Sequence, residues 1–288
     1  MIPRAKDIRI PKRKNNFFIQ EKHMRYKFAA TDMDGTLLNN FNEITPYTAD
    51  IIRQAVSAGL IFSICTGRPI EGVSRYLKQL DIQGPVITYN GAMILDSATG
   101  KILYRQDLEA EDARKILETG IHYNTTMCIW SDNKLYGNQL NDRIYEYSQA
   151  TKVTPLLIPS IDTLLAQGIT KILWYDDAAR IQQIEKELSG TALFHNVTFC
   201  TSKPFYLEFF NNAVSKAAAI DRIGDLYGFS SLETIAIGDG FNDLSMIRHA
   251  ALGVAMANAP DEVKQCADYV TTHTNNEDGV AEVLEKFI

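Results

Sequence analysis

Two aspartates separated by one residue are the clearest chemical feature of this sequence. Asp32 and Asp34 lie in the stretch TDMDGT, directly after the short apolar segment 26–30. Carboxylates this close repel each other when both are ionised, so a fold must gain something by keeping them together. Asp239 and Asp243, in the stretch GDGFND, follow another apolar segment. Four carboxylates in one cleft favour Mg²⁺, a hard cation that binds carboxylate oxygens together with water and substrate phosphate.

The positions of these acidic residues in the sequence indicate their roles in phosphoryl transfer through a covalent intermediate. Asp32, at the end of its predicted strand, is the candidate nucleophile that attacks phosphorus. Asp34 can protonate the leaving alcohol and later deprotonate the attacking water. Asp239 is expected to bind Mg²⁺, and Asp243 to bind it directly or through water. Gly35 lets the chain turn and leaves room near the phosphate.

Four other residues are candidates for binding the phosphate. Lys216 supplies a positive charge for the phosphoryl oxygens. Thr66, with the backbone N–H groups near Gly67, can donate hydrogen bonds at a predicted helix start. Asn242 is expected to contact the phosphate or to orient Lys216. Asn90, which follows the apolar segment PVITY, is a candidate contact for the rest of the substrate.

Alternating strand and helix signals predict how these residues are positioned. Apolar segments 26–30, 60–65 and 85–89 predict strands, and Thr45 and Pro46 predict the cap and first turn of an intervening helix. A second helix is expected over 68–80. This alternation indicates a parallel sheet with helices on both faces. Ligands bind at the carboxyl ends of the strands in such sheets, where the polar residues above are expected to meet.

The middle of the chain has a different pattern and is expected to be an inserted α+β domain, at residues 111–208. A hairpin over 92–108, with DSATGK as its turn, precedes it. Within it we expect helices over 111–122, 141–150 and 177–188 and strands over 126–131, 170–175 and 205–210. The alternation then resumes with a helix over 214–228, strands over 234–240, 251–256 and 268–272, and a helix over 277–287. The predicted fold class is therefore α/β.

Composition excludes several classes of protein. The chain has 288 residues, 45% apolar and 22% charged, which is ordinary for one large or two modest globular domains. A net charge of −6 argues against nucleic acid as the main partner. No apolar run approaches the ~20 residues that a membrane span needs. Four cysteines without a CxxC pair indicate reduced thiols in a cytoplasmic protein.

The first 24 residues differ from the rest of the chain in charge. They contain seven Lys and Arg residues and two acidic residues, with no helical or alternating period and no apolar core of a secretory signal. We expect this basic leader, residues 1–24, to be disordered or to lie upstream of the true start at Met24. A basic arm for RNA, a membrane or a partner is the alternative.

Four segments in order resemble the motifs of haloacid dehalogenase (HAD) superfamily phosphatases: DMDGTL (32–37), CTGR (65–68), VSKAAAI (214–220) and GDGFND (238–243). Three more are similar to the Cof-type branch with a large α/β cap, subclass IIB: YNGA (89–92), GVAMANA (253–259) and NNEDGVAEVL (275–284). The resemblance covers residues 25–288. The chain departs from it at Ala213 and Ala217, where the branch often has glycine, and Lys216 is expected to keep its place.

The resemblance implies a Rossmann-like three-layer core, formed by residues 25–110 and 209–288, with the cap inserted at 111–208. It also implies Mg²⁺ as cofactor, a phospho-aspartate at Asp32 and a metal contact from the backbone carbonyl of Asp34. The expected function is Mg²⁺-dependent hydrolysis of small phosphate monoesters, either sugar phosphates or phosphorylated cofactors of the flavin or pyridoxal type. A sugar phosphomutase is the alternative. A non-catalytic regulatory protein is disfavoured because every motif carboxylate is present.

Several other side chains have plainer expected roles. Arg68 is expected to be structural or a charge at the rim, and Cys65 to be an inert buried thiol. The aromatic residues Trp130, Trp174 and Tyr175 of the predicted cap are expected to be mainly core or sheet residues. The alternative is that one or two of Tyr123, Trp130 and Trp174 line the pocket.

Overall fold

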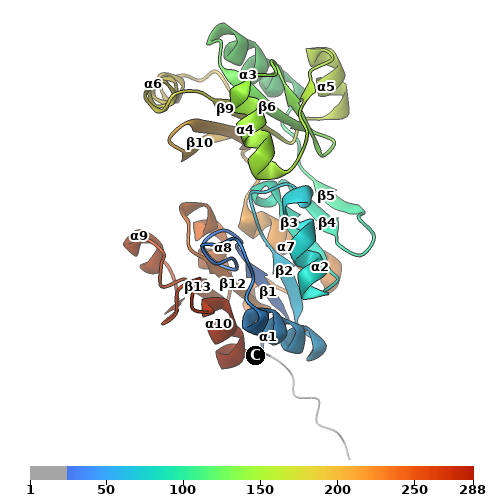
Figure 1. Ribbon diagram of the computed structural model, residues 1–288, viewed down its shortest axis with the longest axis vertical. Helices are drawn as coiled ribbons and strands as arrows, with labels where there is room; N and C mark the ends of the chain where they lie inside the picture. The colour runs from blue at the N-terminus through green and yellow to red at the C-terminus, as the bar shows by residue number, and fades with distance from the viewer. Residues whose placement is uncertain (1–24) are drawn as a thin grey trace, which may run out of the picture.

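The computed structural model describes residues 25–288, which form two lobes (Figure 1). The predictions made for residues 1–24 lie outside this range. In the lower lobe of Figure 1 a parallel sheet has the strand order β14-β13-β12-β1-β2. Its strands are β1 (Phe28–Thr31), β2 (Ile61–Ile64), β12 (Thr234–Gly238), β13 (Leu252–Ala255) and β14 (Tyr269–Val270). No helix within residues 25–288 combines the length and apolar character needed to cross a membrane.

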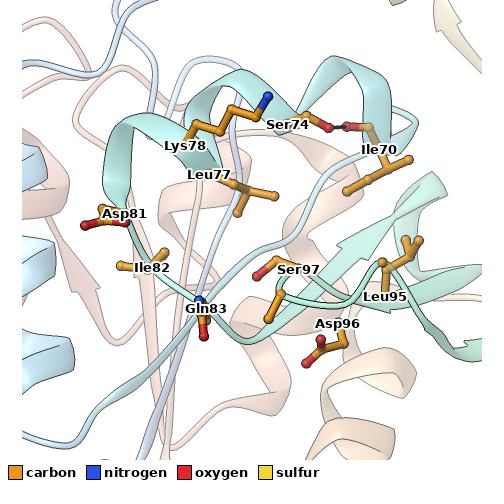
Figure 2. A pocket seen from close by; sticks show the side chains of 12 residues that line it. Ile70, Ser74, Leu77, Lys78, Asp81, Ile82, Gln83, Leu95, Asp96 and Ser97 are labelled. Carbon is orange, nitrogen blue, oxygen red and sulfur yellow. Dashed lines mark hydrogen bonds between the residues drawn. The ribbon is translucent and has the colours of Figure 1, made fainter.

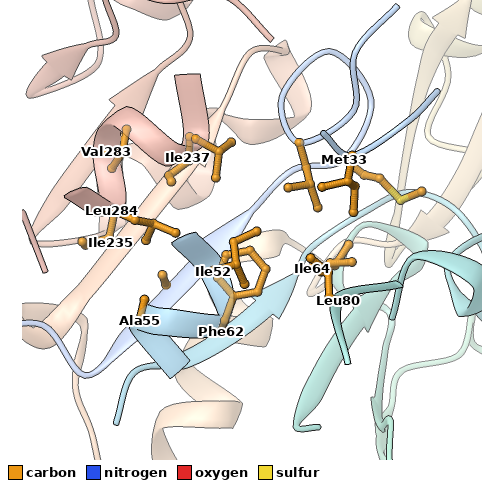
Figure 3. Close-up of a cluster of buried hydrophobic side chains, with 14 of the residues drawn as sticks. Met33, Ile52, Ala55, Phe62, Ile64, Leu80, Ile235, Ile237, Val283 and Leu284 are labelled. Carbon is orange, nitrogen blue, oxygen red and sulfur yellow. The ribbon is translucent and has the colours of Figure 1, made fainter. Parts of the chain in front are cut away.

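Helices cover both faces of this sheet because its strands are apolar on both sides. Ile235 and Ile237 of β12 point to one face, where they join the cluster drawn in Figure 3, and Ala236 between them joins the cluster on the other. One face carries α1 (Pro46–Ser57), α2 (Ser74–Leu80) and α10 (Gly279–Phe287); the other carries α7 (Lys216–Tyr227) and α8 (Leu244–His249). The short α9 (Asp261–Lys264) packs on β13. The predicted three-layer core is confirmed.

A small antiparallel sheet extends the lower lobe. It consists of β3 (Pro85–Thr88), β4 (Met93–Asp96) and β5 (Ile102–Arg105). The expected hairpin is present, and the Gly100 N–H donates to the Asp96 carbonyl in its turn. The third predicted strand departs from expectation: β3 meets β2 only through one parallel bridge, between Cys65 and Ile87, and otherwise pairs antiparallel with β4.

The upper lobe is a six-stranded sheet with helices. Its strand order is β10-β11-β9-β6-β7-β8, and all neighbours are antiparallel except β7 and β8. The strands are β6 (Thr126–Ser131), β7 (Lys134–Gly137), β8 (Leu156–Leu157), β9 (Lys171–Tyr175), β10 (Val197–Lys203) and β11 (Tyr206–Asn211). The helices are α3 (Ala110–His122), α4 (Asp142–Thr151), α5 (Ile161–Gln167) and α6 (Ala178–Ser189). The division of the chain at 110/111 and 208/209 stays a prediction, and β11 crosses the second of these boundaries.

The two faces of this upper sheet pack differently. Buried residues of α3, α5 and α6 cluster with Ile172, Trp174 and other residues on one face. On the opposite face, Leu173 and its neighbours cluster with Ile144 and Tyr147 of α4. Strand alternation alone assigns these residues to the two faces, since successive side chains point in opposite directions.

Local signals predicted some elements better than others. Thr45 caps α1, accepting from the Thr48 N–H at 3.1 Å, with Pro46 in the first turn, as expected. The single helix predicted over 68–80 is wrong: a 3₁₀ turn, η1 (Ile70–Gly72), precedes α2. The Arg68 side chain packs on this turn and donates to the Gly72 carbonyl. The helices α5, α8 and α9 and the strands β7, β8 and β10 were not predicted.

Candidate active site

The ends of two neighbouring strands bring the predicted acidic residues together. Strands β1 and β12 pair in parallel with Thr31 opposite Ile237, so Asp32 and Asp239 emerge side by side. The Asp32 N–H donates to the Ile237 carbonyl at 2.8 Å, which fixes the backbone at the start of the loop. One carboxylate oxygen from each of Asp32, Asp239 and Asp243 lies within 4.8 Å of the other two.

Lys216 lies beneath this group and is only 1% exposed. Its Nζ donates to Asp32 Oδ1 at 2.5 Å and to Asp243 Oδ1 at 2.6 Å. It is the first residue of α7, whose cap Ser215 accepts from the Ala218 N–H. Lys216 thus contacts both carboxylates. It keeps its expected place even though Ala213 and Ala217 stand where the Cof-type branch often has glycine.

The cluster holds more negative charge than Lys216 balances. Burial raises the pKa of Asp32 well above its ordinary value, and the charge of Asp243 adds to the effect. Burial also raises the pKa of Asp239 to about 6, against the hydrogen bond from Thr36. Burial opposes the charge of Lys216, but the carboxylates of Asp243 and Asp32 outweigh it and raise its pKa. Hard oxygen donors with surplus negative charge fit Mg²⁺.

Both oxygens of Asp243 already have partners. Oδ1 accepts from Lys216, and Oδ2 accepts from the backbone N–H groups of Asp239 and Gly240 at 3.0 and 2.8 Å. Asp243 is fully buried and does not border the cavity described below. Of the two expected ways for it to bind a metal, this arrangement favours contact through water.

Asp34 is the most exposed of the four carboxylates, with 54% of its side chain accessible. Arg68 donates to it from both Nε, at 2.8 Å, and Nη2. Arg68 also reaches back to Thr66, whose Oγ1 accepts from the Arg68 N–H at 3.2 Å. Arg68 was expected to be structural or a charge at the rim, and its ion pair with Asp34 at the edge of the cavity is a role of that kind. Its place within CTGR, beside Thr66, was the sequence signal.

The remaining predicted phosphate and substrate residues line the same cavity. Thr66, Gly67, Asn90 and Asn242 all border it with Asp32. Asn242 Nδ2 donates to Asn90 Oδ1 at 3.3 Å, while no hydrogen bond within residues 25–288 joins Asn242 to Lys216. Of the two roles expected for Asn242, orienting Lys216 is thus not supported.

Two supporting residues were missed by the sequence reasoning. Thr36, inside the DGT stretch, donates to Asp239 Oδ1 at 2.6 Å. Asn258 donates to the Gly35 carbonyl at 2.8 Å and so fixes the turn after Asp34. Thr36 lies two residues after Asp34 and was recognisable as part of the motif. Asn258 lies 223 residues away from Gly35, and only the fold brings the two together.

Gly35 is required for the approach of Asp239. Its φ is +81°, and a Cβ there would lie 2.4 Å from Asp239 Oδ2. We expect Gly35→Ala to raise the Mg²⁺ concentration needed for half-maximal activity about 10- to 100-fold, because the added methyl group displaces Asp239, a candidate metal ligand. Gly100→Ala is the matched control, since φ there is +70° and no atom lies within 4 Å. Both variants are expected to lose about 1–3 kcal/mol of unfolding free energy, measured by denaturant titration, but only Gly35→Ala to alter the Mg²⁺ dependence of phosphate release.

The cavity has a volume of about 540 Å³ and lies between the two lobes. The upper lobe contributes residues from α4, β9, β10 and β11: Tyr147, Ala150, Thr151, Lys171, Ser202, Lys203, Tyr206 and Glu208. None of Tyr123, Trp130 and Trp174 borders it, so the alternative that one or two of them line the pocket is wrong, and the expectation that Trp130 and Trp174 are core residues is confirmed. Trp130 and Trp174 are buried inside the upper lobe, where Trp130 Nε1 donates to the Tyr147 hydroxyl at 2.9 Å.

A second cavity, of about 370 Å³, lies between α2 and the β4–β5 hairpin (Figure 2). Leu77 and Lys78 border it from the helix, and Leu95 and Ser97 from the hairpin side. It contains none of the predicted site residues. Of these two cavities, only the larger is bordered by predicted site residues.

The similarity of this chain to known proteins extends over both lobes. A family model for haloacid dehalogenase-like hydrolases matches residues 29–284. The chain is 33% identical over 269 residues to "Putative phosphatase YxeH" of Bacillus subtilis, covering 91% of this chain and 98% of the relative. It is 29% identical to 5-amino-6-(5-phospho-D-ribitylamino)uracil phosphatase YcsE of the same organism, covering 94% and 99%. A crystal structure of a haloacid dehalogenase-like hydrolase from Bacteroides thetaiotaomicron has a TM-score of 0.82 at 29% identity, covering 91% and 100%.

Proposed function

The chain belongs to the haloacid dehalogenase-like hydrolases and is a phosphatase of phosphoric monoesters, and we propose that it hydrolyses small phosphorylated metabolites through a phosphorylated Asp32 with Mg²⁺ bound. One observation carries this proposal. The carboxylate of Asp32 borders the cavity while Lys216 holds its Oδ1 from below and Asp239 lies within ligand distance. A nucleophile and a candidate metal ligand thus border the cavity together, and the charge partner of the nucleophile is buried directly behind them.

The candidate metal ligands are Asp32, Asp239, the backbone carbonyl of Asp34 and, through water, Asp243. When bound there, Mg²⁺ would offset the crowded negative charge and stabilise charge on the phosphoryl oxygens. Asp32 attacks phosphorus, forming the phospho-aspartate as the bond to the leaving alcohol breaks. Lys216 keeps the Asp32 carboxylate in place and balances charge.

Asp34 serves the two proton transfers. In its acid form it protonates the leaving alcohol oxygen, and as a carboxylate it then removes a proton from the water that attacks the phospho-aspartate. Its exposed position lets it reach the leaving group, and Arg68 holds it at the edge of the cavity. Thr66, Gly67 and Asn242 border the cavity with Asp32, which supports a role for them in hydrogen-bonding the phosphoryl oxygens.

The substrate class is proposed from the size of the cavity and from the relatives. About 540 Å³ accommodates a small metabolite of the sugar-phosphate or cofactor-precursor type. YcsE is named for a phosphate ester that carries a ribityl chain, which is a sugar alcohol joined to a base. We propose sugar phosphates and phosphorylated cofactors or their precursors as the substrates to be tested first.

Phosphate release tests this function. The purified chain would be assayed on sugar phosphates, nucleotides, flavin mononucleotide and pyridoxal phosphate, with Mg²⁺ and with a chelator. We expect release of inorganic phosphate that stops when the chelator is added and returns with excess Mg²⁺. Isomerised sugar phosphate without free phosphate would indicate a phosphomutase instead. Release unaffected by the chelator would contradict the metal role.

A further inference from the structure

The upper lobe presents a buried ion pair to the cavity. Lys171 lies two residues before Leu173 on β9, and Glu208 of β11 pairs directly with Leu173. Because side chains alternate along strands, Lys171 and Glu208 share the face of the sheet that looks toward the lower lobe. Leu173 on this face is covered by α4, whereas Lys171 and Glu208 border the cavity together with Asp32.

These two side chains are close to fully enclosed. Lys171 Nζ donates to Glu208 Oε2 at 2.9 Å, with side-chain exposures of 6% and 10%. Ser202 of β10 donates to the other carboxylate oxygen, Glu208 Oε1, at 2.7 Å. The three residues come from three adjacent strands, so the sheet fixes their relative positions. A hydrogen-bonding group on this wall is therefore preorganised before any substrate binds.

This pair has hydrogen-bonding capacity beyond its own contact. An ammonium group has three donors, and within residues 25–288 Glu208 is the one acceptor for Lys171. A carboxylate accepts about four hydrogen bonds, and Glu208 accepts two. Ion pairs buried in this way contribute little to stability compared with apolar residues of similar size. Their position on the cavity wall therefore points to recognition.

We propose that Lys171, Glu208 and Ser202 determine specificity by binding hydroxyl groups of the alcohol part of the substrate, which is therefore a sugar or sugar alcohol. A hydroxyl both donates and accepts, so adjacent hydroxyls match an ammonium beside a carboxylate. The Lys171–Glu208 pair has no net charge, so it does not favour substrates that carry a second phosphate group. This inference rests on the proposed function and narrows its substrate class.

Matched substrates test the inference. Glucose 6-phosphate supplies several hydroxyls, whereas phenyl phosphate supplies none. We expect Glu208→Gln to lower kcat/KM for glucose 6-phosphate about 10- to 100-fold, the cost of losing hydrogen bonds to a charged group. Its kcat/KM for phenyl phosphate is expected to stay within about threefold of the wild type, because phenyl phosphate has no hydroxyl group that could bind Glu208. Glu187→Gln, an exposed carboxylate of the same lobe, is the matched control.

Folding is separated from recognition by the choice of variants. Glu208→Gln can still accept from Lys171, and Ser202→Ala changes an exposed residue, so at least one is expected to fold as wild type, checked by thermal unfolding. An equal loss on both substrates would overturn the inference and assign the pair a structural role. The inference would also be overturned if both Glu208→Gln and Ser202→Ala hydrolysed glucose 6-phosphate and phenyl phosphate as fast as the wild type does. A wild type inactive on both substrates would overturn the proposed function as well.

Discussion

Asp32→Asn is expected to lower phosphate release by about four orders of magnitude or more, as for other catalytic nucleophiles. The amide keeps the size of the side chain but cannot attack phosphorus at a useful rate. The fold is expected to survive, because burial and the neighbouring carboxylate of Asp243 already disfavour the charge on Asp32, as its raised pKa indicates. The measurement is phosphate release beside denaturant unfolding of the same preparations.

The control for Asp32→Asn removes a carboxylate elsewhere. Asp261, whose side chain is 89% exposed, lies on α9 outside the cavity. Asp261→Asn is expected to retain full activity. Residual activity of Asp32→Asn above about one tenth of the wild type, with unchanged Mg²⁺ dependence, would contradict a covalent intermediate on Asp32.

Lys216→Met is expected to lose both stability and activity. The substitution leaves Asp32 and Asp243 buried and facing each other without the ammonium that joins them. Removing one partner of a buried ion pair costs about 3–5 kcal/mol of unfolding free energy. Phosphate release is expected to fall about 10²- to 10³-fold, the range for loss of one group that stabilises developing charge. Denaturant unfolding without metal and steady-state assays measure the two effects.

A double variant separates these two losses. Lys216→Met with Asp243→Asn removes one of the stranded carboxylates, so part of the lost stability is expected to return while activity stays low. Lys134→Met, a lysine with a side chain 57% exposed, is the control and should change stability by less than about 0.5 kcal/mol. If Lys216→Met alone unfolded at the same denaturant concentration as the wild type, the contact of Lys216 with Asp32 and Asp243 would contribute nothing to the free energy of unfolding.

The acidic core of the site was predictable because each member follows a strand that the sequence signals strongly. Asp32 follows FAAT, and Asp239 follows TIAIG, both continuous apolar runs that end abruptly in polar residues. Parallel pairing of neighbouring strands brings such ends together whatever the details of packing. The predicted family and fold class are confirmed by the family match and by the shared fold.

The shortest missed strand and the shortest missed helix have a physical cause in common. Strand β8 has two residues and helix α9 has four. Segments this short contain less than one useful repeat of a hydrophobic pattern, so their local sequence does not distinguish them from loops. The predicted helix over 68–80 failed for a different reason, since the side chain of Arg68 occupies the turn at Gly72. The position of the Arg68 side chain depends on its contact with Asp34, which is distant in the sequence, so a local pattern does not reveal it.

The sequence by itself determined the family, the alternating core and the identity of the carboxylates and lysine, because these depend on residue types at strand ends and on motif order. Tertiary structure decided which side chains complete the site. The Asp34–Arg68 contact spans 34 residues, and the Lys171–Glu208 contact spans 37. Both depend on strand register and loop path, which no local pattern encodes, since shifting a strand by one residue turns its side chains to the opposite face.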